Sequence, residues 1–136
     1  MERRVVITGL GTISPVGNTV ADFWNSLIEG KSGLNFIQGY DDVDLPVRIV
    51  AQVKDFNPIA NGLERADVRK MDLYCQYALA SAIMAVEDSA MDLEKVDKNR
   101  IGVVFGVGIG GMKTYEEEVT SYAKTCDTIG PKFNPF

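Results

Sequence analysis

Histidine is absent from this chain of 136 residues, and cysteine nearly so. Without an imidazole, these residues cannot assemble a Ser-His or Cys-His nucleophile, bind zinc through an imidazole nitrogen or move protons near neutral pH. The two cysteines, Cys75 and Cys126, provide neither a disulfide framework nor the paired spacing of metal ligands. The composition therefore predicts no metal site and excludes the commonest nucleophilic catalysts from this stretch of sequence.

Long apolar runs and a surplus of positive charge are also missing. The apolar run after Arg3 and Arg4 is short and ends at glycines, which predicts a strand rather than a signal peptide. No other run approaches the length of a membrane span, so we expect a soluble, cytoplasmic protein. Lys and Arg number 14 against 19 Asp and Glu, a net charge of −5, which argues against general nucleic-acid binding. A local basic cluster could still dock an acidic partner.

Hydrophobic residues are plentiful, at 46% of the chain, which is enough for one packed domain over residues 1–136. Periodicity and Gly or Pro breaks predict three strands and three helices. The strands are expected at residues 3–8, 47–53 and 101–107, and the helices at about 19–29, 69–90 and 112–124, with a loop at 55–67. This alternation indicates an α/β fold with a mostly parallel sheet.

The longest expected helix, at about 69–90, is apolar around most of its circumference, which predicts a buried central helix. Its small residues would allow another element to pack closely: Ala78, Ala80, Ala82 and Ala85. A chain of this size rarely encloses a helix on all sides. We therefore expect further protein or a tight partner around it.

Closely spaced glycines after an apolar strand raise the question of nucleotide binding. The first pair, Gly9 and Gly11, fails the G-x-G-x-x-G pattern, because Ser14 takes the third position and Pro15 follows. A second cluster fits the pattern formally: Gly106, Gly108 and Gly111. Such an isolated match is weak, and no acidic residue follows at the ribose-binding distance. Tight turns and close backbone approach are the better explanation for these glycines.

Several motifs, taken in order, are similar to one family. They are RRVVITGLGTISPVGN at 3–18, VKDFN at 53–57, RKMD at 69–72, RIGVVFGVGIGG at 100–111 and NPF at 134–136. Together they resemble the β-ketoacyl-acyl-carrier-protein synthases, and most closely the synthase II type. The resemblance covers essentially the whole chain.

The resemblance implies the incomplete N-terminal half of a thiolase-like fold in a homodimeric condensing enzyme that needs no cofactor. The implied reaction is a decarboxylative Claisen condensation of acyl and malonyl groups on acyl carrier protein during fatty-acid elongation. The family's nucleophilic cysteine and two histidines would lie beyond this chain. Neither Cys75 nor Cys126 lies in the nucleophile's sequence setting, so the 136 residues alone are expected to be inactive.

The resemblance also implies two kinds of site. Gly108 and Ile109 match the stretch that lines the acyl tunnel, with Ile109 as the residue that gates acyl length; packing in a core is the alternative for Ile109. Arg69, Lys70 and Lys132 match positions that dock the acidic carrier protein, and a solvated helix start is the alternative there. Arg65 matches less well, because acidic neighbours dilute the positive charge.

Three other functions stay open at this stage. A polyketide-type ketosynthase or a chain-length factor that has lost its nucleophile would share the same fold. A non-catalytic truncated module could dimerise or bind carrier protein. A nucleotide-dependent reductase is the weakest alternative, given the failed glycine pattern.

Overall fold

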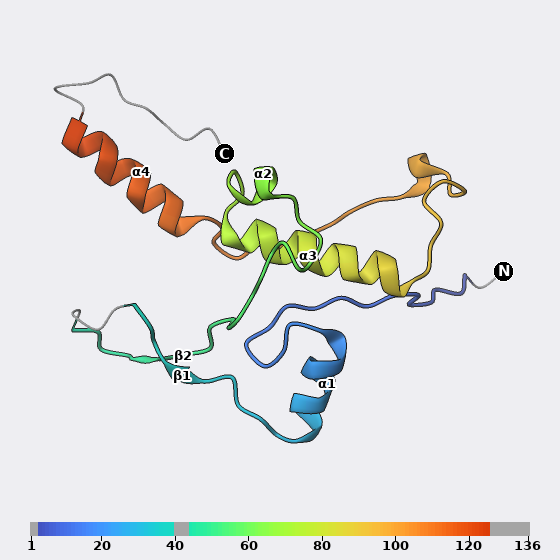
Figure 1. The fold of residues 1–136 in the computed structure, drawn as a ribbon, viewed down its shortest axis with the longest axis horizontal. Helices are drawn as coiled ribbons and strands as arrows, with labels where there is room; N and C mark the ends of the chain where they lie inside the picture. The colour runs from blue at the N-terminus through green and yellow to red at the C-terminus, as the bar shows by residue number, and fades with distance from the viewer. Residues whose placement is uncertain (1–2, 40–43, 126–136) are drawn as a thin grey trace.

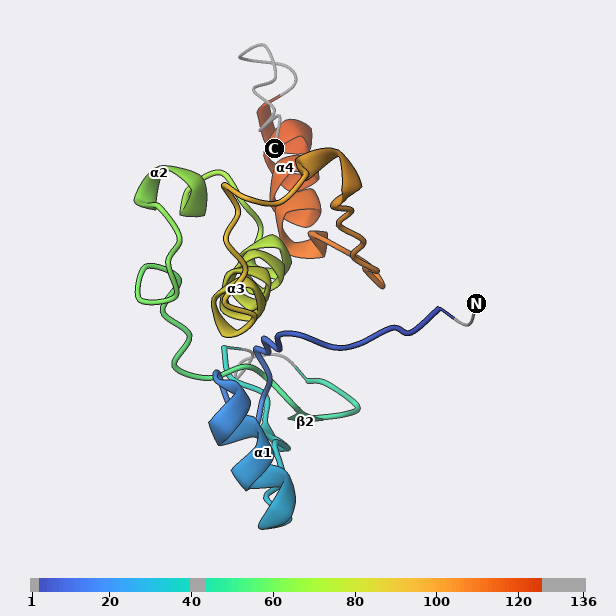
Figure 2. The ribbon, with the colours of Figure 1, turned by 90° about the vertical axis from the view of Figure 1, so that its right-hand side faces the viewer.

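The computed structural model describes residues 3–39 and 44–125 (Figure 1). The elements follow one another as α1 (Val20–Ile28), β1 (Asn35–Phe36), β2 (Ile49–Val50), α2 (Arg65–Val68), α3 (Leu73–Asp88), a 3-10 turn η1 (Lys98–Arg100) and α4 (Met112–Thr125). Helix α3 lies at the centre, with the N-terminal segment along one side of it and residues 101–110 on the opposite side (Figures 1 and 2). Helix α4 extends away from α3. No helix in the described part of the chain is long and apolar enough to cross a membrane.

The expected mostly parallel sheet is not confirmed. Strands β1 and β2 pair antiparallel, with Asn35 opposite Val50 and Phe36 opposite Ile49, and theirs is the sole sheet within the described residues. The expected strand at 47–53 is thus reduced to two residues, and β1 was not expected. The segments 3–8 and 101–107 run without a strand partner, because no neighbouring backbone lies beside them to complete a ladder. The coarser expectation of an α/β chain stands.

Helix α1 begins and ends as its sequence predicts. The Thr19 hydroxyl accepts a hydrogen bond from the Asp22 backbone N–H at 3.1 Å and donates to the Asp22 carboxylate at 2.8 Å, so the first turn is capped. At the other end Gly30 takes φ +66°, and its N–H donates to the Leu27 carbonyl at 3.1 Å. The Lys31 N–H donates to the Ser26 carbonyl at 2.9 Å, which completes a Schellman motif.

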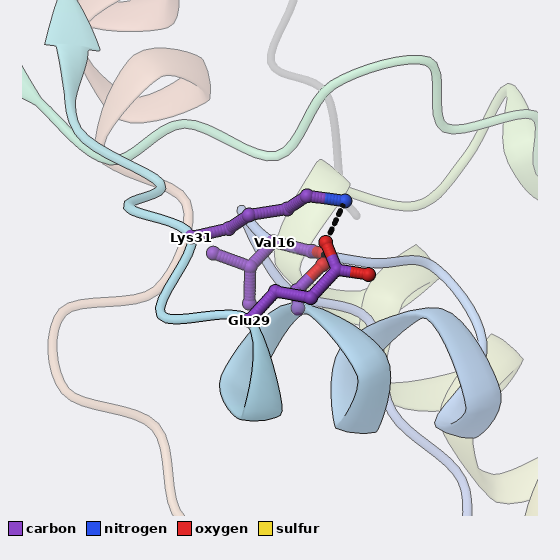
Figure 3. Close-up of polar contacts among 4 residues, drawn as sticks. Val16, Glu29 and Lys31 are labelled. Carbon is purple, nitrogen blue, oxygen red and sulfur yellow. Dashed lines mark hydrogen bonds and ion pairs between the residues drawn. The ribbon is translucent and has the colours of Figure 1, made fainter.

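The end of α1 is held against the loop before it. Lys31 forms an ion pair with Glu29 at 2.6 Å across the helix end (Figure 3). Ser26, one of the few buried polar residues, donates its hydroxyl to the Val16 carbonyl at 2.7 Å. Both side chains of the ion pair are exposed, so the pair contributes little to stability. The hydrogen bond of the buried Ser26 hydroxyl instead fixes the angle between the loop and the helix.

Helix α3 is shorter and less buried than expected. It starts at Leu73 because residues 69–72 form a turn, and it ends at Asp88 before Ala90, whose φ is +51°. Only Gln76 and Ala80 of the helix are buried, and most of its other residues are half-buried. The expected buried central helix is not confirmed, because irregular segments rather than packed strands surround α3 in this chain.

The first glycine pair packs against the backbone of α3. A Cβ on Gly11 would overlap the Ser81 carbonyl and lie 2.9 Å from the Ala85 nitrogen; one on Gly9 would lie 2.7 Å from the Ser89 nitrogen. Residues 81, 85 and 89 are four apart, so their small side chains form one narrow face of the helix. The interpretation of these glycines as packing residues is confirmed.

Much of the apolar surface of the chain is uncovered. Leu63 and Ala80 are the hydrophobic residues that are buried among those described. Val5 is 91% exposed and Val104 is 95% exposed, one in each unpaired extended segment. The accessible surface is 11371 Å², whereas a compact protein of this mass exposes about 7,000 Å². This excess fits the expectation that further protein covers the chain.

Candidate functional site

An apolar groove of about 710 Å³ lies between one face of α3 and the segment 103–108. Eleven residues line it, and most are aliphatic or aromatic: Met71, Tyr74, Cys75, Ala78, Leu79, Ala82, Val103, Phe105, Gly106, Val107 and Gly108. A concave surface of this composition can take a hydrocarbon chain or an apolar protein segment. Gly108, one of the two expected acyl-lining residues, is therefore at the groove.

Ile109 lies outside that groove. Its side chain is 80% exposed and borders a smaller cleft of about 290 Å³ together with Gly111, Met112 and Tyr115. Gly110, which follows it, has φ +81°, a conformation that favours glycine. The chain thus turns sharply after Ile109, and the two expected acyl-lining residues lie at different hollows of this chain.

A junction between the starts of α3 and α4 was not foreseen from the sequence. The Asp72 carboxylate does not cap its own helix; it accepts a hydrogen bond from the Thr114 hydroxyl, 42 residues further along the chain. A Cβ on Gly111 would lie 2.6 Å from the Asp72 Cγ, and one on Gly110 would lie 3.8 Å from the Tyr74 ring. We call these five residues, Asp72, Tyr74, Gly110, Gly111 and Thr114, the Asp72 junction.

The Asp72 junction also bears on nucleotide binding. In a dinucleotide fold the pyrophosphate lies at the helix start that follows the third glycine of the pattern. Here that start is the first turn of α4, and the Asp72 carboxylate lies against Gly111 and Thr114 in that turn. A carboxylate in this place would repel a phosphate, so the geometry disfavours the reductase alternative.

The expected docking residues Arg69 and Lys70 lie on the turn between α2 and α3, and both are exposed. Helix α2 itself falls partly in the expected loop at 55–67, so the sequence pattern missed it. The Arg69 Nε donates to the Arg65 carbonyl at 3.3 Å, and within the described residues neither Arg69 nor Lys70 forms an ion pair. The third docking residue, Lys132, lies outside the described residues.

This turn is held firmly to α3. The buried Gln76 side chain donates through Nε2 to the Met71 carbonyl at 2.9 Å and to the Val68 carbonyl at 3.2 Å. One amide therefore satisfies two backbone acceptors on either side of Arg69 and Lys70. The positive charges therefore project from a turn that two hydrogen bonds tie to α3.

Two tyrosines of α3 have different surroundings, and of the two only Tyr74 lines the groove. Tyr77 packs edge-on against Phe56 of the VKDFN motif, with ring centroids 4.9 Å apart, and burial raises the pKa of Tyr77. Tyr74 lines the groove, and its hydrogen bond with Cys75 raises the pKa of Tyr74. Both phenols are thus protonated at neutral pH.

Cys75 and the carboxylates of the described residues form no metal-holding group. Cys75 is half-buried in the groove wall, where it packs as a small apolar residue. Cys126, like the NPF motif at 134–136, lies outside the described residues. Over residues 3–39 and 44–125, no group of three or more Cys, Asp or Glu side chains is placed to hold a metal ion.

Comparison with protein families gives one match over nearly the whole chain. The family model described as the N-terminal domain of β-ketoacyl synthase matches residues 2–133. A curated relative from Coxiella burnetii, 3-oxoacyl-acyl-carrier-protein synthase 2, is 43% identical over 136 residues, which is 99% of this chain and 32% of the relative. The chain therefore spans about a third of the length of the relative it matches.

Two solved structures share the arrangement of the chain. The ishigamide ketosynthase/chain length factor superposes with a TM-score of 0.81 at 26% identity, covering 93% of this chain and 31% of that one. A type II polyketide ketosynthase, bound to a hexaketide and in complex with its acyl-carrier protein, gives a TM-score of 0.74 at 28% identity. That match covers 96% of this chain and 35% of the other.

Proposed function

Because the chain belongs to the β-ketoacyl synthase family, whose N-terminal domain its residues 2–133 match, we propose that it forms the N-terminal part of a 3-oxoacyl-acyl-carrier-protein synthase II. The observation that carries the proposal is the 43% identity to a curated synthase 2 over 99% of the chain. The intact protein would move an acyl group from its carrier to a cysteine, decarboxylate malonyl carrier protein and join the two. The cysteine and two histidines for those steps would come from the other part of the protein.

We propose that the other part of the protein, which supplies the cysteine and histidines, also completes the fold of this chain. The unpaired segments 3–8 and 101–107 would become strands of a mostly parallel, thiolase-like sheet, and α3 would become its buried helix. The exposure of Val5 and Val104 supports this, because residues so apolar are buried in parallel sheets. A homodimer in the cytoplasm, without a cofactor, is part of the same proposal.

The acyl group would lie against the apolar groove and the turn at Ile109. The groove supplies an apolar wall without a charged side chain, and Gly108 leaves space because nothing lies within 4 Å of a Cβ placed there. The exposed Ile109 side chain projects from the turn between Gly108 and Gly110. The size of the Ile109 side chain would then set how long an acyl chain can enter the groove.

Carrier protein would dock on Arg69, Lys70 and Lys132. The first two are exposed, free of ion pairs within the described residues and held on a turn that is hydrogen-bonded to α3, which suits steering of an acidic partner. The known complex of a similar ketosynthase with its acyl-carrier protein supports a partner of this class.

Replacing Ile109 by phenylalanine tests the acyl site. In the intact protein, Ile109→Phe should lower the rate of acylation by palmitoyl carrier protein about tenfold, because overpacking of an apolar passage costs about 1–3 kcal/mol. Acetyl transfer should change by less than about twofold. Acyl-enzyme formation is followed by intact mass spectrometry over a series of chain lengths.

The control is Ile109→Leu, which keeps the volume and should acylate like the unmodified protein. Equal acylation by palmitoyl carrier in both variants would show that Ile109 is a packing residue. Failure of the unmodified protein to form any acyl-enzyme would contradict the proposed function itself.

A polyketide-type ketosynthase or chain-length factor is the second candidate. The superposition on the ishigamide ketosynthase/chain length factor favours it. Sequence identity favours the fatty-acid enzyme, at 43% against 26% for that structure. A truncated module that only binds carrier would keep docking on Arg69 and Lys70 but form no acyl-enzyme.

A further inference from the structure

Two features of the proposed synthase lie close to one another in this chain. The docking turn carries Arg69 and Lys70, and the segment 108–111 carries the acyl-lining residues. In sequence they are about forty residues apart. In the structure the Asp72 junction joins them.

Hydrogen bonds of Gln76 tie the docking turn and Asp72 to the same turn of α3. Asp72 follows Lys70 by two residues, and its backbone carbonyl accepts the Gln76 N–H at 3.1 Å in the first turn of α3. The Gln76 side chain ties the preceding carbonyls of Val68 and Met71 to the same turn of helix. A displacement of Arg69 or Lys70 would therefore carry the Asp72 side chain with it.

The Asp72 side chain in turn holds the acyl-lining segment. Its carboxylate accepts the Thr114 hydroxyl and fills the space beside Gly111 that a Cβ would need. A carboxylate at the first turn of the 14-residue helix α4 is also favoured by the helix dipole. The Tyr74 ring closes on Gly110 from the same end of α3. Ile109 is thereby attached, through two glycines, to the start of α3.

We propose that Asp72 is a positioning residue that couples carrier docking to the acyl gate, a proposal that rests on the proposed synthase function. When carrier protein binds Arg69 and Lys70, the Asp72–Thr114 hydrogen bond holds Ile109 in the position that admits the acyl chain. Asp72 takes no part in the chemistry. Gly110 and Gly111 follow Ile109 directly, and position 111 is occupied by glycine because a Cβ there would clash with the Asp72 carboxylate.

The test compares two acyl donors in the intact protein: palmitoyl carrier protein and palmitoyl pantetheine, which has the same thioester without the carrier. Asp72→Ala should lower the saturating rate of acylation from the carrier-borne donor about tenfold, the scale of one charge-assisted hydrogen bond. The KM for carrier should stay within about twofold. Acylation from palmitoyl pantetheine should change by less than about twofold, because this donor has no carrier protein to bind Arg69 and Lys70.

Matched variants separate the hydrogen bond from general damage. Thr114→Val should reproduce the loss, and the double variant should lose no more than either single one, since both remove the same interaction. Asp72→Asn and Thr114→Ser keep an acceptor and a hydroxyl and should retain most of the rate. Glu116→Gln removes an exposed carboxylate from the same helix and serves as the charge control.

Each outcome decides the proposal. Equal losses of acylation rate with both donors would assign Asp72 a purely structural role. Acylation rates within about twofold of the unmodified protein for every variant would show that the position of Ile109 does not depend on carrier docking. Either result overturns the proposal while the synthase function stands. If the unmodified protein is acylated by neither donor, the proposed function itself is wrong.

Discussion

Replacing Gly11 by valine should lower the free energy of unfolding of the intact protein by about 3–5 kcal/mol, or prevent folding. The reason is the contact with α3, where a Cβ would overlap the Ser81 carbonyl and lie 2.9 Å from the Ala85 nitrogen. Both obstacles are backbone atoms of a helix, which cannot turn aside as a side chain can, so the cost lies at the upper end for single substitutions. Denaturant unfolding monitored by circular dichroism measures the change.

The control for Gly11→Val is Ala21→Val, which adds bulk at an exposed position of α1. Its expected cost is the helix propensity difference alone, below about 0.7 kcal/mol. If the Gly11→Val and Ala21→Val variants unfold at the same denaturant concentration, the packing of the N-terminal segment on α3 is contradicted.

Reversing both docking charges, in Arg69→Glu/Lys70→Glu, should raise the Kd for acyl carrier protein at least about 30-fold at low salt. Two cations that attract an acidic partner become two anions that repel it, at about 1 kcal/mol or more for each residue. Because neither side chain forms an ion pair within the described residues, reversal disturbs no other contact of that kind. Isothermal titration or surface plasmon resonance against carrier protein gives the Kd.

Lys98→Glu is the matched control, because η1 lies toward the far end of α3 from α2 (Figure 1). It should leave the Kd within about twofold. The difference in Kd between the two variants should become smaller as the salt concentration rises, since screening weakens the interactions of exposed charges. A carrier affinity that is equal in both variants would remove Arg69 and Lys70 from the docking surface.

Helices α1 and α4 could be predicted from the sequence because their signals are local. Thr19 and Gly30 mark the ends of α1, and the structure places the helix between them at Val20–Ile28. For α4 the expected range of about 112–124 agrees with Met112–Thr125. Packing by Gly9 and Gly11 also follows from the sequence, because Ser14 and Pro15 are incompatible with a phosphate-binding turn.

The sheet and the Asp72 junction could not be predicted in the same way. Strand formation needs a partner backbone, and the apolar patterns at 3–8 and 101–107 predict burial without supplying that partner. The pairing of Asp72 with Thr114 spans 42 residues, and no spacing rule links a helix-start carboxylate to a threonine so distant. Helix α2 was missed because its four residues are too few to show a period.

The most direct test is the condensation itself. The intact protein is mixed with octanoyl carrier protein and malonyl carrier protein, without any nucleotide, and the carrier products are weighed by mass spectrometry while carbon dioxide is collected. We expect 3-oxodecanoyl carrier protein and one carbon dioxide for each molecule formed. No elongated product, or a product that forms only when a second ketosynthase subunit is added, would contradict the assignment of this chain to a synthase II.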